Sequence, residues 1–269
     1  MKEYLVAVDL EGIHGIVGEP YRTMTDSSDY KLACENAIKE INAVVSGLFD
    51  GGADRVTVWD NHGSWHNLDR SLIDGRVDFI NGDTPKKNGR IFFADEHSYS
   101  GMLCIGYHSK EGTVGGVLAH TYNSVGVQYY KLNGKTVGEL EVDQYTAAEY
   151  GFTVLLVASD KAGADEATAA FPGVRTVITK LGKTRNSADF IPEKEVLERL
   201  YEESKALVKE PSPAPIRLPM PATFEKRFTR VEDAYKRLDT LLALGFDARF
   251  TEDAHTVAYT LNHISDIFA

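Results

Sequence analysis

Three polar side chains that can bind a metal ion or carry a proton come directly after apolar, strand-like segments. Asp9 closes the segment YLVAVD, His62 follows RVTVWD, and His108 follows MLCIGY. In open α/β sheets, ligands bind at the edge formed by the carboxyl ends of the strands. We therefore expect these three side chains to converge at one sheet edge, although they lie far apart in the sequence.

A second carboxylate accompanies the first of these residues. Glu11 comes two residues after Asp9, so an extended backbone through Leu10 directs both side chains to the same face. Two carboxylates held close together repel one another, which raises a pKa unless a cation lies between them. The pair indicates a metal site, and the alternative interpretation is one salt-bridged aspartate beside one solvated glutamate.

The two histidines occupy similar settings. His62 lies in the polar turn DNHGS (60–64), and His108 lies in GYHS (106–109). An imidazole in a tight turn after a strand suits a metal ion, and Asp60 is a candidate for a carboxylate that orients the His62 ring and fixes its tautomer. The alternative for either residue is a loop histidine that bonds to the backbone.

Two further residues are ambiguous by themselves. Glu139 follows Gly138 at the expected start of a helix, where a glutamate commonly offsets the helix dipole. His120, in LAHTY (118–122), is a candidate metal ligand, a candidate general acid or base, or a structural residue.

Considered together, two histidines and three carboxylates form a candidate ligand set, with His120 as an additional histidine. Mixed nitrogen and oxygen ligation suits zinc, or manganese where oxygen dominates. Two ions about 3.5–4 Å apart would require a bridging carboxylate and a bridging water. The candidate ligands are Asp9, Glu11, His62, His108 and Glu139.

Elements that position these residues can be predicted from hydrophobic periodicity. Apolar residues recur at helical spacing from about 29 to 49, a charged amphipathic helix covers 192–208, and residues 153–179 form a βαβ-like unit. Strands that alternate with helices predict a three-layer α/β/α sandwich. The Asn133–Gly134 pair predicts a β-hairpin over 127–137, so we expect a mixed, largely parallel central sheet.

The chain is long enough for one large α/β domain, or for a large domain with a smaller appendage. We assign residues 1–210 to a metal-binding catalytic α/β domain. A proline-rich connection at 211–221 begins a C-terminal segment, 211–269, which we expect to pack on that domain or to be part of it. The tail is predicted to contain strand-like and helical pieces, the last of them a helix from about 254 to 268.

Composition argues against several classes of protein. The formal net charge is −11, and no cluster of lysine and arginine stands out, which argues against nucleic acid as a partner. No run of about 18 apolar residues and no secretory leader pattern is present, so neither a membrane span nor export is expected. Cys34 and Cys104 do not form a disulfide framework. A cytoplasmic location is the simplest expectation.

Five short motifs, in this order along the chain, resemble those of the DppA family of zinc D-aminopeptidases, the dipeptide-transport-operon hydrolases. Each motif is weak alone, but five in order with similar spacing are specific, and the likeness spans roughly residues 3 to 210. The motifs are VDLEG (8–12), DNHGS (60–64), GYH (106–108), LAHTY (118–122) and NGKTVGE (133–139).

The resemblance implies an α/β/α fold, two zinc ions per chain and hydrolysis of short peptides with an N-terminal D-amino acid. It also implies a homo-oligomer, specifically a homodecamer that encloses its active sites. The family's catalytic histidine falls on His120, and we expect Asp9 to be the bridging carboxylate. The family's metal ligands fall on Asp9, Glu11, His62, His108 and Glu139.

The sequence departs from the family pattern near the site without removing a ligand. The family often has alanine where Asn61 stands and asparagine where Asp143 stands, and it commonly has Ser-Gly-Asp where this chain has Ala-Ser-Asp at 158–160. These differences place the substrate preference in doubt rather than the metal site.

Two other functions fit a metal site at strand ends. One is a two-metal phosphoesterase or another amidohydrolase. Calcineurin-type phosphoesterases typically begin with Asp-x-His, where this chain has Asp9-Leu10-Glu11, and Gly82–Asp83 only weakly matches their following Gly-Asp motif. The other alternative is a protein that binds metal on the same fold without catalysing a reaction.

Overall fold

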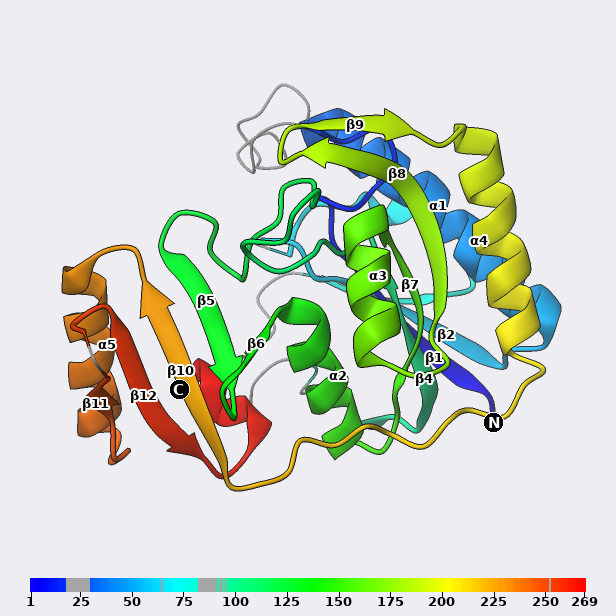
Figure 1. The fold of residues 1–269 in the computed structure, drawn as a ribbon. Coiled ribbons are helices and arrows are strands. Elements are labelled where there is room, and N and C mark those ends of the chain that lie inside the picture. Colours follow the sequence, from blue (N-terminus) through cyan, green and yellow to red (C-terminus); the bar gives the residue numbers. More distant parts are fainter. Residues whose placement is uncertain (18–29, 64, 82–90, 92–93, 95, 252) are drawn as a thin grey trace.

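The chain folds into two β-sheets and the helices that cover them (Figure 1). This computed structural model describes residues 1–269 except 18–29, 64, 82–90, 92–93, 95 and 252. Ser64, Gly82 and Asp83 therefore lie outside the described residues. The larger sheet contains, in spatial order, β3 (Asp78–Ile80), β2 (Arg55–Asp60), β1 (Glu3–Val8), β4 (Tyr99–Ile105), β7 (Val154–Asp160), β8 (Arg175–Thr184) and β9 (Ser187–Phe190).

All neighbouring strands of the larger sheet run parallel except β8 and β9. The sheet is therefore mixed and largely parallel, as predicted. The antiparallel pair, however, is not the predicted 127–137 hairpin, which lies in the second sheet. A tight turn specifies that two strands pair with each other, but it does not specify the sheet that they join.

Helices cover both faces of the larger sheet, which confirms the predicted α/β/α sandwich (Figure 1). Successive side chains of β1 point to opposite faces: Val6 packs toward α1 and α4, and Ala7 packs toward α2 and α3. Both faces are apolar because both are buried. The four helices are α1 (Tyr30–Gly51), α2 (Glu139–Glu149), α3 (Lys161–Ala170) and α4 (Glu193–Leu207); a short 3₁₀ helix, η2 (Arg70–Leu72), follows β2.

The second sheet draws its strands from two distant parts of the chain. The hairpin of β5 and β6 turns at Asn133 and Gly134, which both have positive φ (50° and 80°), as a type I′ turn requires. β5 then pairs with β10, so residues 211–269 are joined to the hairpin by backbone hydrogen bonds. The sheet contains β11 (Arg249–Phe250), β12 (Thr256–Leu261), β10 (Ala222–Phe228), β5 (Val127–Leu132) and β6 (Lys135–Val137), with α5 (Val231–Ala243) packed on it.

The predicted helix from about 254 to 268 is wrong in its first half. Residues Thr256–Leu261 form strand β12, and only Ile264–Phe268 is helical, as the 3₁₀ helix η4. Val257, Tyr259 and Leu261 lie in the same buried cluster, which reflects a period of two rather than 3.6.

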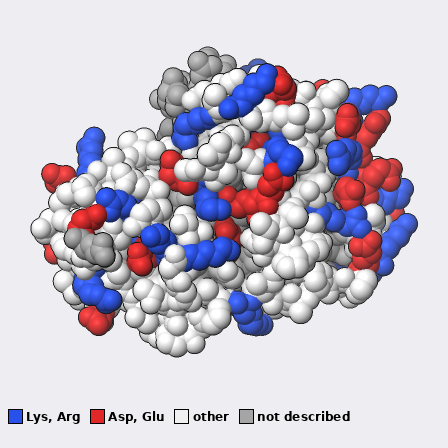
Figure 2. All heavy atoms as spheres, in the orientation of Figure 1, with Lys and Arg blue, Asp and Glu red and all other residues white. Residues whose placement is uncertain are grey.

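Charged side chains lie on the surface without a dominant sign on the face that Figure 2 shows. Basic side chains are scattered, and the charges over α4 at the right alternate between acidic and basic, as its sequence does. Among the described residues, no helix is both long and apolar enough to cross a membrane.

Candidate metal centre

Three adjacent strands of the larger sheet deliver the predicted side chains to one edge. Asp9 follows β1, His62 follows β2, and His108 follows β4, with β1 between the other two. Since these strands are parallel, their carboxyl ends meet at the same edge. The convergence predicted from the three strand ends is confirmed.

Close backbone contact draws the loops after β1 and β4 together. A Cβ at Gly12 would lie 2.0 Å from the carbonyl oxygen of Tyr107, and a Cβ at Gly106 would lie 2.2 Å from that of Asp9. Gly106 also has a φ of 74°, which favours glycine. Glycine at these two positions allows the Asp9 loop and the His108 loop to pack in direct contact.

Asp9, Glu11 and His62 form the first group of potential ligands. His62 Nδ1 lies 2.7 Å from Asp9 Oδ1 and 3.2 Å from Glu11 Oε2. One donor atom from each residue lies within 4.8 Å of the others, and the two carboxylates are buried. We name these residues the strand-end triad.

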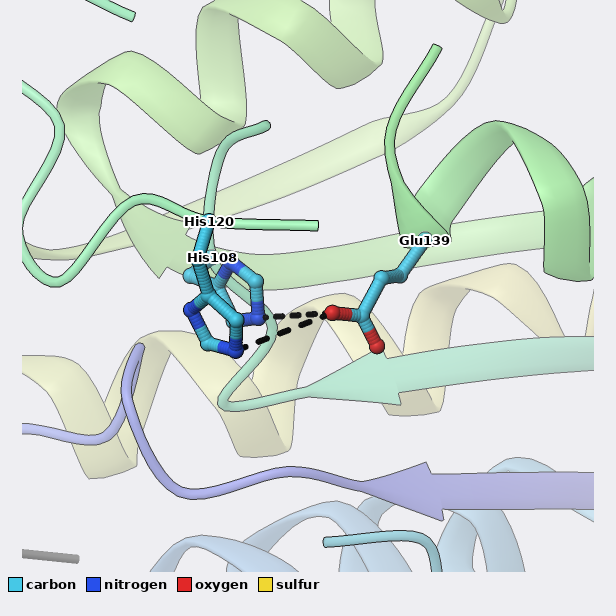
Figure 3. A group of neighbouring side chains, drawn as sticks. All are labelled: His108, His120 and Glu139. Carbon is cyan, nitrogen blue, oxygen red and sulfur yellow. Dashed lines mark ion pairs between the residues drawn. The ribbon is translucent and has the colours of Figure 1, made fainter. Parts of the chain in front are cut away.

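His108, His120 and Glu139 form the second group, which we name the loop triad (Figure 3). Glu139 Oε1 lies 3.3 Å from His108 Nε2 and 3.8 Å from His120 Nε2. The two imidazole rings stack with centroids 3.9 Å apart and planes inclined by 13°. His120, which the sequence left open between ligand, proton carrier and structural residue, therefore points a ring nitrogen at the same carboxylate as His108.

Asp9 joins the two triads. Its Oδ1 faces His62 in the strand-end triad, while its Oδ2 lies 3.5 Å from His108 Nε2 in the loop triad. The six side chains thus form one continuous polar centre.

The backbone around His120 is held in an unusual conformation. Leu118 and Tyr122 are non-glycine residues with φ of 54° and 59°. Positive φ is uncommon for such residues and costs on the order of 1–3 kcal/mol where the surroundings impose it. The carbonyl of Leu118 accepts a hydrogen bond from His120 Nδ1 at 2.8 Å, and Tyr122 N donates to Glu139 Oε1 at 2.7 Å. The two strained residues thus orient the side chains of His120 and Glu139 in the loop triad.

Both histidines of the loop triad direct the same nitrogen inward. A carbonyl oxygen can only accept, so the hydrogen bonds to Leu118 O and Ser109 O require a proton on Nδ1 of His120 and of His108. This arrangement leaves Nε2 of each ring facing the site, and a backbone carbonyl is a common partner for the remote nitrogen of a metal-binding histidine.

Asp60 does not contact the His62 ring in the way the sequence suggested. Its carboxylate instead accepts hydrogen bonds from Asn67 N at 2.6 Å, Asn67 Nδ2 at 2.7 Å and Leu68 N at 3.1 Å. Asn67 Nδ2 also donates to the carbonyl of His62 at 2.6 Å. Asp60 therefore orders the backbone of the loop that carries His62 rather than its imidazole.

Sequence reasoning missed a buried polar network beside the centre. Asn61 Nδ2 donates to the Tyr107 hydroxyl at 2.7 Å, and that hydroxyl donates to Asp143 Oδ2 at 2.7 Å. Asn61 and Asp143 had been noted only as departures from the resembled family. Their mutual contact through Tyr107 depends on the packing of α2 against the sheet, which no local pattern shows.

Lys180 was also missed. Its side chain is fully buried, and its ammonium group donates to three backbone carbonyls of the loop after β1. Burial lowers the pKa of Lys180 to about 8, although nearby Asp160, Glu40 and Glu11 oppose that shift. The signal available in the sequence was a lysine within an otherwise apolar strand, VITKL (177–181).

The carboxylates of the strand-end triad have displaced pKa values. Burial, and then the neighbouring Glu11 charge, raise the pKa of Asp9 to about 7. Burial also opposes ionisation of Glu11, but the imidazoles, His62 foremost, hold the pKa of Glu11 well below its usual range. The charges of the two carboxyl groups repel one another, and a cation beside them would relieve this repulsion.

The histidines respond to this negative charge in different ways. Burial disfavours the imidazolium of His108, but the hydrogen bond and charge of Glu139 outweigh burial and raise its pKa to about 10. Burial is likewise outweighed at His62, mainly by Glu11, so the pKa of His62 lies well above its usual range. For His120, burial and then the neighbouring His108 lower the pKa. Protons on His62 and His108 thus supply positive charge that metal ions would otherwise supply.

The donor set fits divalent metal ions. Three imidazoles and three carboxylates form two groups, each with ligand atoms close enough to share an ion. Mixed nitrogen and oxygen donors are the ligands that zinc accepts in hydrolytic sites. Three buried carboxylates beside neutral imidazoles would carry uncompensated negative charge, which also calls for a cation at this position.

Comparison with known proteins identifies the family and the fold of the chain. A sequence model of the D-aminopeptidase family matches residues 1–269. The D-aminopeptidase of Bacillus subtilis (strain 168) is 33% identical over 189 residues, which cover 70% of this chain and 66% of that protein, just under two thirds of its length. A solved structure of the Zn-dependent D-aminopeptidase DppA from Bacillus subtilis, described as a self-compartmentalizing protease, superposes with a TM-score of 0.86. It is 23% identical, and the match covers 99% of this chain and 94% of that chain, which establishes the shared fold.

Proposed function

The chain belongs to the D-aminopeptidase family, and from that membership we propose that it is a two-zinc peptidase that removes D-amino acids from the amino terminus of short peptides. One structural observation carries the proposal: two metal-binding triads lie side by side with Asp9 between them. The likeness to the Bacillus subtilis D-aminopeptidase over 70% of the chain supports the same activity.

Five side chains would hold the ions, and Asp9 would bridge them. The support for bridging is that each Asp9 oxygen faces a histidine of a different triad. Bound zinc, or manganese in its place, would polarise the scissile carbonyl and lower the pKa of a bound water toward about 7. The proposed ligands are Asp9, Glu11, His62, His108 and Glu139.

His120 is the proposed proton carrier. Its Nδ1 is committed to Leu118 O, and its Nε2 faces the centre. Because burial and His108 lower its pKa, the ring is neutral near pH 7 and can accept a proton at Nε2 and pass it to the leaving amine. Stabilisation of the developing oxyanion is the other role open to this ring.

A ligand role for His120 has a specific observation in its favour, because its Nε2 belongs to the same group as His108 and Glu139. The number of ions kept when His120 is removed separates the two roles. The phosphoesterase alternative is not favoured, because the family matched along the whole chain is a peptidase family.

We propose that the protein acts as a cytoplasmic homo-oligomer on short peptides. The described self-compartmentalization of the structurally similar DppA supports assembly, and the family resemblance suggests a decamer.

A metal-replete activity screen tests the function directly. The zinc-loaded protein would be assayed on matched D- and L-alanyl amides, on D- and L-alanyl dipeptides and on an aryl phosphate, with elemental analysis of the same sample. We expect two ions per chain and turnover of the D-alanyl substrates only. Preferred cleavage of the aryl phosphate, or equal cleavage of both enantiomers, would contradict the proposal.

A further inference from the structure

Strand β8 extends beyond its parallel neighbour at the edge where the site lies (Figure 1). β7 ends at Asp160, which pairs with Lys180, whereas β8 continues to Thr184 and turns into β9. Lys180 therefore lies level with the carboxyl edge of the sheet, and Arg185, at the turn between β8 and β9, lies past it. No ligand of either triad is on this hairpin.

Lys180 holds the loop after β1, which carries Asp9 and Glu11 of the strand-end triad. Its Nζ donates to Glu11 O at 2.5 Å, to Ile13 O at 2.9 Å and to Ile16 O at 2.6 Å. The preceding residue adds a fourth contact, because Thr179 Oγ1 donates to Gly12 O at 2.6 Å. Four carbonyls of residues 11–16 are thus held by two adjacent residues of one strand.

Arg185 fastens the loop that carries His120. Its guanidinium donates to the carbonyl of Ala119, and its own carbonyl accepts from Leu118 N at 2.9 Å. Leu118 has positive φ and supplies the carbonyl that orients the His120 ring. Arg185 is therefore hydrogen-bonded to the backbone on both sides of the peptide unit between residues 118 and 119. The carbonyl of that peptide unit orients the His120 ring.

Between these two contacts, the hairpin packs in direct contact with the loop that carries His120. A Cβ at Gly182 would lie 2.0 Å from the carbonyl oxygen of Gly115 and 3.0 Å from a methyl group of Val117. The hairpin and the 115–119 loop consequently cannot move apart or slide without losing this contact. The stretch of chain from Lys180 to Arg185 touches both halves of the centre.

We propose that β8 and its turn form a brace, residues 179–185, in which Lys180 and Arg185 are positioning residues that fix the strand-end triad relative to the loop triad. The proposal rests on the proposed function only insofar as the two triads hold metal ions. The hydrogen bonds of the brace described above go to backbone carbonyls, so they set where the two triads stand.

The Arg185 contact is tested with Arg185→Ala and Arg185→Lys, with Lys183→Gln as the matched control. Lys183 is exposed on the same hairpin and forms an ion pair with Asp189. Loss of a contact behind a ligand typically costs 10–100-fold in activity or metal affinity, so we expect kcat of Arg185→Ala to fall by about that factor with KM nearly unchanged. Added guanidinium should restore part of the loss, and Arg185→Lys should lie between Arg185→Ala and wild type.

The Lys180 contact is tested by metal retention rather than by activity alone. Lys180→Met, and the milder Thr179→Val if the first variant does not fold, would be titrated with a chelator while bound zinc is counted. We expect metal affinity to fall by about 10–100-fold. We also expect Arg185→Ala to keep both ions, because the backbone that Arg185 holds orients His120, which is not among the five proposed ligands.

Specific outcomes would overturn the brace. Wild-type kcat in Arg185→Ala, or equal losses of kcat in Arg185→Ala and Lys183→Gln, would show that the hairpin tip does not position His120. Unchanged zinc retention in Lys180→Met or Thr179→Val would show that these two residues do not position the loop that carries Asp9 and Glu11. If the wild-type protein bound two ions but cleaved no D-alanyl substrate, the proposed function would be wrong. The zinc titrations would still test whether the brace positions the metal-binding side chains.

Discussion

The two triads of the metal centre reach the same place by different means. The strand-end triad depends on the sheet, since Asp9 and His62 follow neighbouring parallel strands and need little beyond strand order to meet. The loop triad depends on backbone held in unusual conformations, since His120 lies between two residues of positive φ and Glu139 begins a helix. The order of the parallel strands positions the strand-end triad, whereas long-range contacts of irregular backbone position the loop triad.

The triads also differ in charge. The strand-end triad has two carboxylates and one imidazole, and the loop triad has two imidazoles and one carboxylate. More carboxylate charge attracts a cation more strongly where solvent is excluded. We therefore expect the ion in the strand-end triad to be the last removed by a chelator, and four experiments examine the contrast further.

The largest effect is expected from Asp9→Ala, because Asp9 is the residue shared by both triads. Loss of both ions removes several kcal/mol of transition-state stabilisation, so activity should fall by roughly 10⁴-fold or more. Elemental analysis should find neither zinc ion. Asp165→Ala, which alters an exposed ion pair with Lys161, serves as the control. Retention of one full ion would assign Asp9 to a single triad.

His120→Ala separates chemistry from metal binding within the loop triad. If His120 carries a proton, activity should fall by about 10²–10⁴-fold while both ions remain. His108→Ala is the comparison, since removal of that proposed ligand should release an ion. Zinc content and kcat would be measured on the same samples. Loss of one ion from His120→Ala would place His120 among the ligands.

The pH dependence of stability should differ between metal-free and metal-loaded protein. In the metal-free protein the pKa of His108 is raised from 6.5 to about 10. A raised pKa contributes stability that is complete below pH 6.5 and is lost as the pH rises toward 10. Metal binding requires deprotonated ligands and strengthens over the same range.

Calorimetry between pH 6.5 and 10, with and without a chelator, measures this difference. We expect the Tm of the chelated protein to decline as the pH rises across this range. The difference in Tm between the metal-loaded and the chelated protein should therefore increase with pH. Two parallel curves would show that His108 is not exchanging a proton for a metal ion.

The smallest effect is expected from the polar network beside the centre. Tyr107→Phe removes the hydroxyl that receives a hydrogen bond from Asn61 and donates one to Asp143. Removing one member of a buried hydrogen-bond network costs about 1–3 kcal/mol, so the free energy of unfolding should fall by that amount. Activity should change little, because no ligand is touched. Tyr201→Phe, which removes an exposed hydrogen bond to Asp50, should cost less in the same denaturant titration.

Local sequence patterns were sufficient for much of the fold. Apolar runs predicted strands that end at Asp9, His62 and His108, and helical periodicity predicted α1 and α4 close to their observed bounds. The α/β/α class follows from this alternation because each amphipathic helix must bury its apolar face on a sheet. The Asn133–Gly134 turn was equally local, since positive φ at two successive residues strongly restricts the residue types.

Local patterns failed where the answer depended on a distant partner. The sequence of β12 is compatible with a helix by itself and becomes a strand because β10 offers edge hydrogen bonds. The hairpin at 127–137 was predicted, yet its placement in the second sheet depends on that same strand, about 90 residues away in the chain.

The sequence by itself determined which residues could bind metal and on which strands they would stand, because strand ends and residue types are local properties. Only the tertiary structure decided how those residues divide into two triads, that His120 shares Glu139 with His108, and that Asp9 lies between the triads. It alone brought Lys180 and Arg185 against the loops of the site. Those contacts join backbone carbonyls and amides, which every residue possesses, so the identity of the side chains in the loops carries no record of them.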